Sequence, residues 1–446
     1  IKNMRKTLLT MVAMLATSGA VMAQNGITEV PDADMLGTMA TAMSPNGRYI
    51  GGSVYATSGG FLFDRETKKV QMYDALDVNT DLQIKSISND GLAVGWNGPA
   101  CTFDFNTNTV KSFGAADQYL FIGISPNGKL IVGARYDGDD AEGTPCYFSN
   151  GTPVDLPQSS DKFLGYNSDG ASALSVSDDS LISGYYVDNM ATRPATLWAL
   201  NKDGKTFSSY PISRRFFASS MESTMPYVIF SCDQTVMSAN GKWLAVNFEK
   251  YIGQWESVKG VARYNTENDS VDFFIANEDD DRFADVGTET YASAVSNDGT
   301  VVGFYGSAFA SRVAYRWKKG EADIERLATA FPGATRLAAY DEGGFNTPSG
   351  ISADGRYISG FGYVADTTAE VEDGEEPHSN WVSWILDTED PAASVGTGVE
   401  KVQVNKANAA SVRARYAIDG TKRQSKFKGL NILQLTNGKA IKTIEK

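Results

Sequence analysis

The sequence predicts an all-β protein: a seven-bladed β-propeller of four-stranded antiparallel blades, followed by a small C-terminal β-sandwich-like module. Two observations support this prediction. A short Ser-x-Asn/Asp-Gly turn recurs seven times along the chain, and a second apolar element follows each copy. The segment 401–446 is basic whereas the residues before it are acidic, which separates the propeller from the tail.

The repeated turn joins two short apolar stretches in every repeat. Its Asn or Asp tolerates the conformation of a tight turn, and its Gly supplies a positive φ. In one copy Ser180 replaces the Gly. The copies begin at Ser44, Ser88, Ser125, Ser177, Ser238, Ser296 and Ser352.

The second element has the pattern of a strand, a polar turn and another strand in the first six repeats. It begins at Gly60, Pro99, Thr144, Pro194, Gly260, Arg312 and Asn380. Each repeat therefore contains four short strands, a to d, and four strands in a unit of roughly 40 to 60 residues are typical of a propeller blade. A solenoid of hairpins has the same strand periodicity and is the alternative.

The seventh repeat lacks a good fourth strand, because residues 381–386 run into an acidic segment that ends at Pro391. The segment 27–31 resembles 153–157, the fourth strand of the third repeat. We expect residues 27–30 to complete the seventh blade, which would close the ring and cover an open sheet edge. Almost no helix is expected after residue 23.

Residues 294–317, AVSNDGTVVGFYGSAFASRVAYRW, contain the best-formed repeat. This repeat resembles the HAF-type repeats of secreted bacterial proteins and, more distantly, TolB-like propeller repeats with a serine-proline-aspartate-glycine turn. The resemblance covers residues 27–390 and implies a propeller. It implies no single activity, because propellers host many functions.

The first 23 residues have the pattern of a secretory signal peptide. A basic pair precedes a short apolar run, and Val21-Met22-Ala23 offers a small-x-small cleavage site. A transmembrane anchor is the alternative, but the apolar run is shorter than a membrane span. We expect a mature chain from Gln24, with a propeller over 24–390, a linker over 391–400 and a β-module over 401–446.

The tail carries 11 Lys and Arg against 2 Asp and Glu, whereas residues 24–400 carry a net charge of −26. Alternating apolar residues with an Asp-Gly and an Asn-Gly turn predict a small β-module. The tail resembles the C-terminal sorting domain of the type IX secretion system of Bacteroidetes, and a generic basic β-domain is the alternative. The matching residues are Arg415, Tyr416, Asp419, Gly420, Lys428, Gly429, Leu430, Asn431, Gly438 and Lys442. Together with the signal peptide, this resemblance implies export into the periplasm and then across the outer membrane.

Composition argues against several classes of chemistry. The chain has a single His, and its three Cys cannot form a zinc ribbon or a disulfide framework. Its net charge of −14 argues against a nucleic-acid partner. Cys101 and Cys146 occupy matching positions in neighbouring blades, and we expect both to be buried free thiols.

One acidic loop contains Asp137, Asp139 and Asp140, whose carboxylates are the oxygen ligands that Ca²⁺ prefers. The spacing of an EF-hand is absent, and a solvated acidic loop is the alternative. Calcium is the one cofactor that the sequence suggests.

The loops between strands b and c vary in length and carry aromatic and acidic residues. In a propeller these loops share one face with the loops between blades, and loops on a rigid scaffold carry most binding sites. The aromatic residues expected to stack on a ligand are Tyr185, Tyr186, Tyr251, Trp255, Tyr305 and Tyr363. The alternative is that several of them cap the outer rim of the core.

These features favour a monomeric binding module, secreted or on the cell surface, that recognises a protein, peptide or glycan and meets secretion machinery through its tail. One alternative is a propeller hydrolase or lyase that acts on glycans or peptides with carboxylates at the central channel. A structural envelope protein is another. No integral membrane segment is expected in the mature chain.

Overall fold

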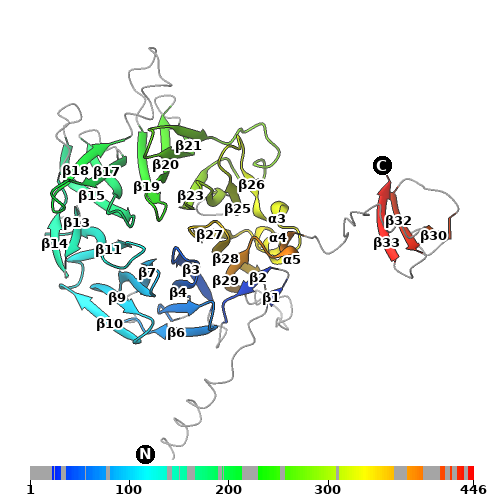
Figure 1. Ribbon diagram of the computed structural model, residues 1–446, viewed down its shortest axis with the longest axis horizontal. Coiled ribbons are helices and arrows are strands. Elements are labelled where there is room, and N and C mark those ends of the chain that lie inside the picture. The colour runs from blue at the N-terminus through cyan, green and yellow to red at the C-terminus, as the bar shows by residue number, and fades with distance from the viewer. Residues whose placement is uncertain are drawn as a thin grey trace, which may run out of the picture.

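The computed structural model describes most of the propeller and part of the tail. It describes residues 23–24, 26–31, 37–55, 57–76, 81–137, 143–149, 151–157, 166–188, 193, 195–212, 230–251, 257–307, 311–365, 379–394, 412–416, 422–423, 429–435 and 440–445. Seven antiparallel sheets surround a central axis (Figure 1), and an eighth sheet lies in the tail. The predicted all-β, seven-bladed propeller is thereby confirmed.

The first six blades follow one another along the chain, each with its four strands paired in chain order. Blade 1 contains β3 (Thr38–Met43), β4 (Tyr49–Val54), β5 (Gly60–Asp64) and β6 (Lys69–Tyr73), and blade 2 contains β7 (Gln83–Ile87), β8 (Leu92–Trp96), β9 (Ala100–Asp104) and β10 (Thr109–Phe113). Blade 3 contains β11 (Tyr119–Ile124), β12 (Ile131–Arg135), β13 (Thr144–Ser149) and β14 (Thr152–Asp155), and blade 4 contains β15 (Tyr166–Val176), β16 (Ile182–Asp188), β17 (Ala195–Leu200) and β18 (Phe207–Pro211). Blade 5 contains β19 (Phe230–Met237), β20 (Trp243–Tyr251), β21 (Ser257–Asn265) and β22 (Val271–Phe274), and blade 6 contains β23 (Thr290–Val295), β24 (Val301–Gly306), β25 (Arg312–Trp317) and β26 (Glu325–Arg326).

Apolar side chains fill the spaces between neighbouring blades. Trp243 and Val261 of blade 5, for example, pack in one buried cluster with Val301 and Trp317 of blade 6. Residues on alternate sides of each strand therefore face different neighbouring blades, and the core is shared around the ring.

The N-terminal segment completes blade 7. This blade contains β27 (Asn346–Ile351), β28 (Tyr357–Ala365) and β29 (Ser379–Asp387), and β2 (Ile27–Glu29) pairs antiparallel with β29. Ile27 lies opposite Leu386, and the Val30 N–H donates to the Ser383 carbonyl at 2.9 Å. The predicted closure of the ring is therefore confirmed, and the short strand β1 (Ala23–Gln24) extends the same sheet beyond it.

As expected, the described residues after residue 23 contain almost no helix; the three helices that they do form are short. Helices α3 (Leu327–Ala330) and α4 (Thr335–Glu342) connect blade 6 to blade 7, and α5 (Pro391–Ser394) follows β29. In α4, Leu337 and Tyr340 lie three residues apart and are both buried, because this helix covers apolar residues of blade 7. None of the helices in the described part of the chain has the length and hydropathy that a membrane span requires.

Helix α5 lies within the segment that the sequence predicts as the linker. Composition places the linker at 391–400, but Ala393 is buried and its carbonyl accepts the Gly333 N–H at 2.9 Å. Residues 391–394 therefore pack on the propeller, and residues 395–400 lie outside the described part.

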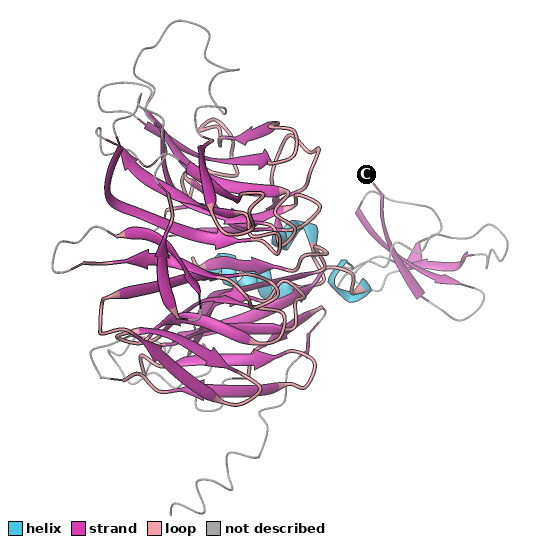
Figure 2. Cartoon of the chain, turned by 60° about the vertical axis from the view of Figure 1, so that its left-hand side comes forward, coloured by secondary structure: helices cyan, strands magenta, loops and turns pink. Residues whose placement is uncertain are grey.

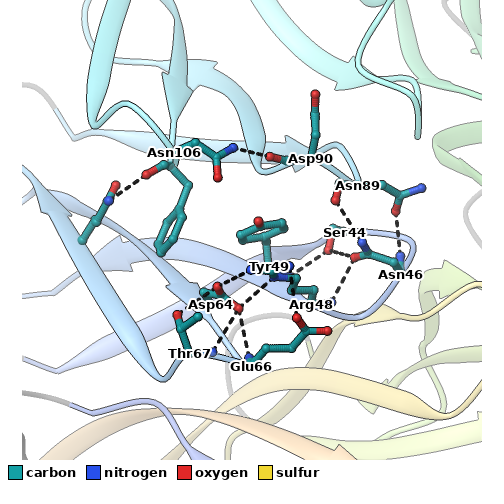
Figure 3. Close-up of polar contacts among 12 residues, drawn as sticks. Ser44, Asn46, Arg48, Tyr49, Asp64, Glu66, Thr67, Asn89, Asp90 and Asn106 are labelled. Atoms are coloured by element: carbon teal, nitrogen blue, oxygen red, sulfur yellow. Dashed lines mark hydrogen bonds and ion pairs between the residues drawn. The ribbon is translucent and has the colours of Figure 1, made fainter.

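The repeated turn folds in the same way in all seven blades. Its Ser hydroxyl is buried and accepts a backbone N–H from the first residue of strand b or from the residue just before that strand. In blade 1 the donor is Tyr49 at 2.9 Å (Figure 3), and in the degenerate copy Ser177 accepts from Leu181 at 3.1 Å. Ser180 takes the left-handed conformation there, with φ of 63°, as Gly47 does in blade 1 with φ of 70°.

Two forms of this turn alternate around the ring. In blades 1, 3, 5 and 7 a donor lies five residues after the Ser and the second turn residue is Pro or Ala. In blade 3 the Lys129 N–H also donates to the Ser125 hydroxyl, at 3.1 Å. In blades 2, 4 and 6 the donor lies four residues after it and the second residue is Asn or Asp.

Hydrogen bonds join the turns of neighbouring blades into a closed ring. Between blades 1 and 2, the Asn46 N–H donates to Asn89 Oδ1 at 2.8 Å and Asn46 Nδ2 donates to the Asn89 carbonyl at 2.9 Å (Figure 3). Asn89 in turn donates its N–H to the Pro126 carbonyl of blade 3 at 2.8 Å. The other junctions are Asn127 to Asp178, Asp178 to Ala239, Asn240 to Asn297, Asn297 to Ala353 and Ala353 to Pro45. The turns thus hold the ends of the a strands around the channel.

The tail contains a sheet of its own. Strands β31 (Lys422–Arg423), β30 (Val412–Tyr416), β32 (Gly429–Leu435) and β33 (Ala440–Glu445) are adjacent in that order and antiparallel. Arg415 and Tyr416 lie in β30, and Lys442 lies opposite Ile432 in the pairing of β32 with β33. Gly429, Leu430 and Asn431 lie in β32, whereas Asp419, Gly420, Lys428 and Gly438 fall outside the described residues.

Candidate functional site

The two faces of the propeller differ. The Ser-x-Asn/Asp-Gly turns all lie on one face, which we call the turn face, because every a strand runs toward it and every b strand runs away. The b strands end, and the c strands begin, on the opposite face, which we call the loop face. Figure 2 shows the strands running between these two faces.

Two of the aromatic residues predicted to stack on a ligand belong to the core instead. Tyr186 is 0% exposed, donates its hydroxyl to the Pro157 carbonyl and packs against Trp198 with ring centroids 5.4 Å apart. Tyr305 is 3% exposed and packs on Phe283 with centroids 4.9 Å apart. Burial also raises the pKa of Tyr305. Both rings pack in buried clusters of the core.

The remaining predicted aromatics are placed differently. Tyr185 is half-buried, with the Arg193 guanidinium 5.4 Å from its ring centroid. Tyr363 is half-buried on the loop face. The side chain of Tyr251 and the whole of Trp255 lie outside the described residues. Ligand stacking therefore stays a prediction for Tyr185 and Tyr363.

Tyr363 belongs to a group of aromatic side chains centred on Trp381, which we call the loop-face aromatic cluster. Its members are Tyr55, Phe345, Phe361, Tyr363 and Trp381. The ring centroid of Trp381 lies 5.0 Å from Tyr363, 5.4 Å from Phe345, 5.8 Å from Phe361 and 6.2 Å from Tyr55. Tyr55 follows β4 of blade 1, and the other four come from blade 7 or the segment before it. The cluster therefore spans the junction at which the ring closes.

Tyr55 is the exposed edge of this cluster. Its side chain is 65% exposed, whereas Phe345, Phe361, Tyr363 and Trp381 are half-buried. Most of this large aromatic side chain therefore faces solvent, where a partner could contact it.

Cationic side chains extend the cluster across blades 6 and 5. The Arg312 guanidinium lies 5.8 Å from the ring centroid of Phe345 and 4.7 Å from that of Phe304. Phe304 stacks on Tyr291 at 4.9 Å, and Lys259 Nζ lies 3.3 Å from the Tyr291 hydroxyl and 2.9 Å from a carboxylate oxygen of Glu289. Burial lowers the pKa of Arg312, whereas the hydrogen bond to Glu289 raises the pKa of Lys259. Both stay cationic at neutral pH.

Sequence reasoning identified Tyr363 but missed the rest of the cluster. Trp381 lies within a strand, and a Trp in a strand is more often a core residue. Tyr55 belongs to a short loop with one aromatic residue, so neither its length nor its composition stood out. Only the closure of blade 7 against blade 1 brings the two rings together.

The central channel is a second candidate site. It holds a cavity of about 530 Å³, lined by the a strands and by the second residues of four turns, among them Pro45 and Ala353. Lys85 is the one charged residue among the described residues that line it, and that part of the lining has no Asp or Glu. The carboxylates that a channel hydrolase would need are therefore absent from the described lining.

The predicted calcium loop is described only in part. Asp137 is exposed and forms an ion pair with Arg135, whereas Asp139 and Asp140 lie outside the described residues. No cluster of three His, Cys, Asp or Glu side chains that could hold a metal occurs among the residues that the structure describes. Calcium binding at this loop stays a prediction.

The two thiols that the structure describes behave as expected. Cys101 and Cys146 are free and buried. Burial raises the pKa of both, that of Cys146 to about 12. These thiols are therefore protonated and unreactive at neutral pH.

No family model matches this chain, and no curated protein matches it. Its fold is similar to the solved structure of U3-55K, with 9% identity, a TM-score of 0.44, and coverage of 81% of this chain and 98% of that one. It is also similar to a streptogramin B lyase, with 10% identity, a TM-score of 0.43 and coverage of 81% and 97%. TolB from Acinetobacter baumannii is similar over 66% of this chain and 64% of its own, with 11% identity and a TM-score of 0.39. The propeller assignment rests on the chain's own seven sheets.

Proposed function

We propose that this chain is a binding propeller that recognises a protein or peptide through the loop-face aromatic cluster. The observation that supports this proposal is the combination of exposed Tyr55, half-buried Trp381 and the Arg312 guanidinium on one face. Trp, Tyr and Arg are the residues most enriched where protein partners bind tightly. Strands β28 and β29 hold Phe361, Tyr363 and Trp381 in place, so these rings lose little conformational entropy on binding.

The location that we propose is outside the cytoplasm, on the cell surface or in the medium. The signal-peptide pattern of residues 1–23 and the resemblance of the tail to a type IX sorting domain support it. The type IX route would imply a source in the Bacteroidetes and a contact between the tail and the secretion machinery. Among the strands that the structure describes, those of the tail pair with one another and with no strand of the propeller, which supports a module presented to that machinery.

The proposal is tested by capturing partners with the full chain and with Tyr55→Ala. Tyr210→Ala is the matched control, because Tyr210 is also a solvent-facing tyrosine, 45% exposed, but lies on the outer strand β18. Crosslinking to proteins of the source envelope should give a partner that the full chain and Tyr210→Ala capture equally. Tyr55→Ala should capture at least tenfold less, because hot-spot aromatics contribute about 2 kcal/mol or more.

Equal capture by both variants would refute a role for the cluster. A glycan array probed with the full chain, Tyr55→Ala and Tyr210→Ala tests whether the ligand is instead a carbohydrate. Binding to a glycan that Tyr55→Ala loses would assign the loop face to a carbohydrate and overturn the protein partner.

A further inference from the structure

The a strands of this propeller share one irregularity. Every a strand has a β-bulge at the same place in its pairing with strand b, so that one residue has no partner. The bulge residues are Thr41, Lys85, Ile122, Leu174, Asp233, Ser293 and Ser349. A bulge re-aims the side chain of its extra residue. The bulges lie at one level of the ring, so we expect the side chains that the structure describes at these positions to point in the same direction.

The described bulge residues face the central channel. All of them line the 530 Å³ cavity except Asp233, whose side chain lies outside the described residues. Thr41 and Lys85 are exposed, whereas the residues before them, Ala40 and Ile84, are fully buried. This contrast shows that the bulge turns Thr41 and Lys85 out of the core.

The ring of bulge residues is polar on one side and apolar on the other. Blades 6, 7, 1 and 2 contribute Ser293, Ser349, Thr41 and Lys85 in succession. Blades 3 and 4 contribute Ile122 and Leu174. An enclosed ligand would therefore meet hydroxyls and an ammonium on one side and aliphatic carbons on the other.

The Lys85 ammonium has no ion-pair partner among the described residues. Its side chain is exposed to the channel, and partial desolvation by the channel walls lowers its pKa. A charge-assisted hydrogen bond to an anion would compensate the ammonium for the hydration that it loses in the channel. The channel therefore suits a negatively charged group.

We propose that the central channel binds a carboxylate carried on an apolar chain. The carboxylate would accept hydrogen bonds from Lys85 Nζ, and the chain would pack against Ile122 and Leu174. The cavity volume lies within the range of roughly 300 to 1,000 Å³ that is usual for small-ligand sites. The site lies at the turn face, so it is separate from the loop-face aromatic cluster and goes beyond the proposed function.

Two sources carry this chemistry, a free medium-chain carboxylic acid and the C-terminus of an apolar peptide. Calorimetric titration of the full chain with octanoate and with the peptide acetyl-Ala-Leu-Leu, as free acid and as amide, distinguishes them. Binding of octanoate alone indicates a free acid. Binding of the peptide acid but not its amide indicates a peptide terminus. Failure of every carboxylate to bind would overturn the proposal.

Variants test the assignment to Lys85. Lys85→Met should weaken carboxylate binding about tenfold or more, because a hydrogen bond to a charged group is lost. Lys111→Met, on the outer strand β10, should bind as the full chain does. Lys85→Glu should instead prefer octylamine to octanoate, which a merely structural effect of the substitution would not produce. Equal affinity of Lys85→Met and the unchanged chain for octanoate would overturn the assignment.

Two further variants test the influence of Asp233 on carboxylate binding and the independence of the channel from the loop-face aromatic cluster. Asp233→Asn, at the corresponding position of blade 5, should bind octanoate at least as tightly as the unchanged chain, and a loss of binding would contradict the role given to Lys85. Tyr55→Ala should bind octanoate normally. The failure of the loop-face proposal and the failure of the channel proposal are therefore distinguishable.

Discussion

The strand that closes the ring makes a quantitative prediction. Ile27 of β2 is 1% exposed and packs in a buried cluster with Trp384, Leu386 and Ala393. Ile27→Ala removes three buried carbon groups, which at about 0.8 kcal/mol each amounts to about 2.4 kcal/mol of transfer free energy. The cavity left behind adds to this loss, so we expect the free energy of unfolding to fall by about 3 kcal/mol.

Urea unfolding followed by tryptophan fluorescence measures this loss, because Trp384 is buried beside Ile27. Ile275→Ala is the control, since Ile275 is 42% exposed and its loss should change the free energy of unfolding by less than about 0.5 kcal/mol. Ile27→Val should fall between the two, at about 1 kcal/mol. If Ile27→Ala and Ile275→Ala had the same effect, β2 would not secure the ring.

Three further predictions concern charge, thiols and the tail. Burial alone would raise the pKa of Asp64, but hydrogen bonds from Arg48 and Thr67 outweigh burial and lower that pKa. The ionised Asp64 carboxylate therefore stabilises the folded state at pH values above its unfolded pKa. This stabilisation is lost as the pH falls through the folded pKa of Asp64. Asp64→Asn should therefore unfold about 2 kcal/mol more easily at pH 7, and this deficit should shrink in urea titrations below about pH 4. Cys101 and Cys146 should fail to react with a thiol reagent in the native chain and react fully in urea, and fast native labelling of either would contradict their burial. Deletion of residues 401–446 should leave the melting temperature of the propeller unchanged and retain the protein in the periplasm of its source, whereas normal surface delivery would refute the sorting role.

The architecture followed from sequence because its signals are local. Ser44 and Gly47 specify a turn within a few residues. The resemblance of residues 27–31 to residues 153–157, the fourth strand of the third repeat, can be recognised directly in the amino-acid sequence. Each of these features needs no knowledge of distant neighbours.

The candidate site was harder because it depends on which side of a blade a ring faces. Tyr185 and Tyr186 are adjacent in β16, so one must face away from the other, and only the register against the next blade decides which is buried. The bulge in each a strand shifts this alternation by one residue, and no pattern of residue types marks the bulges at Lys85 or Leu174. Contacts between remote segments, such as Tyr55 with Trp381, likewise require the closed ring.

The alternation of the two turn forms sets a rule of parity for the ring. Two alternating turn forms cannot close into a ring with an odd number of blades. One junction must therefore join two turns of the same form, and in this ring it is the junction between blade 7 and blade 1. At that seam the Ala353 N–H donates to the Pro45 carbonyl at 2.6 Å, a bond that a Pro at position 353 would abolish. Removal of blade 2 alone would create a second like junction, where Asn46 would meet Pro126, which has no side-chain acceptor for its N–H. A pair of blades, and not a single blade, is therefore the unit by which this ring can be lengthened or shortened.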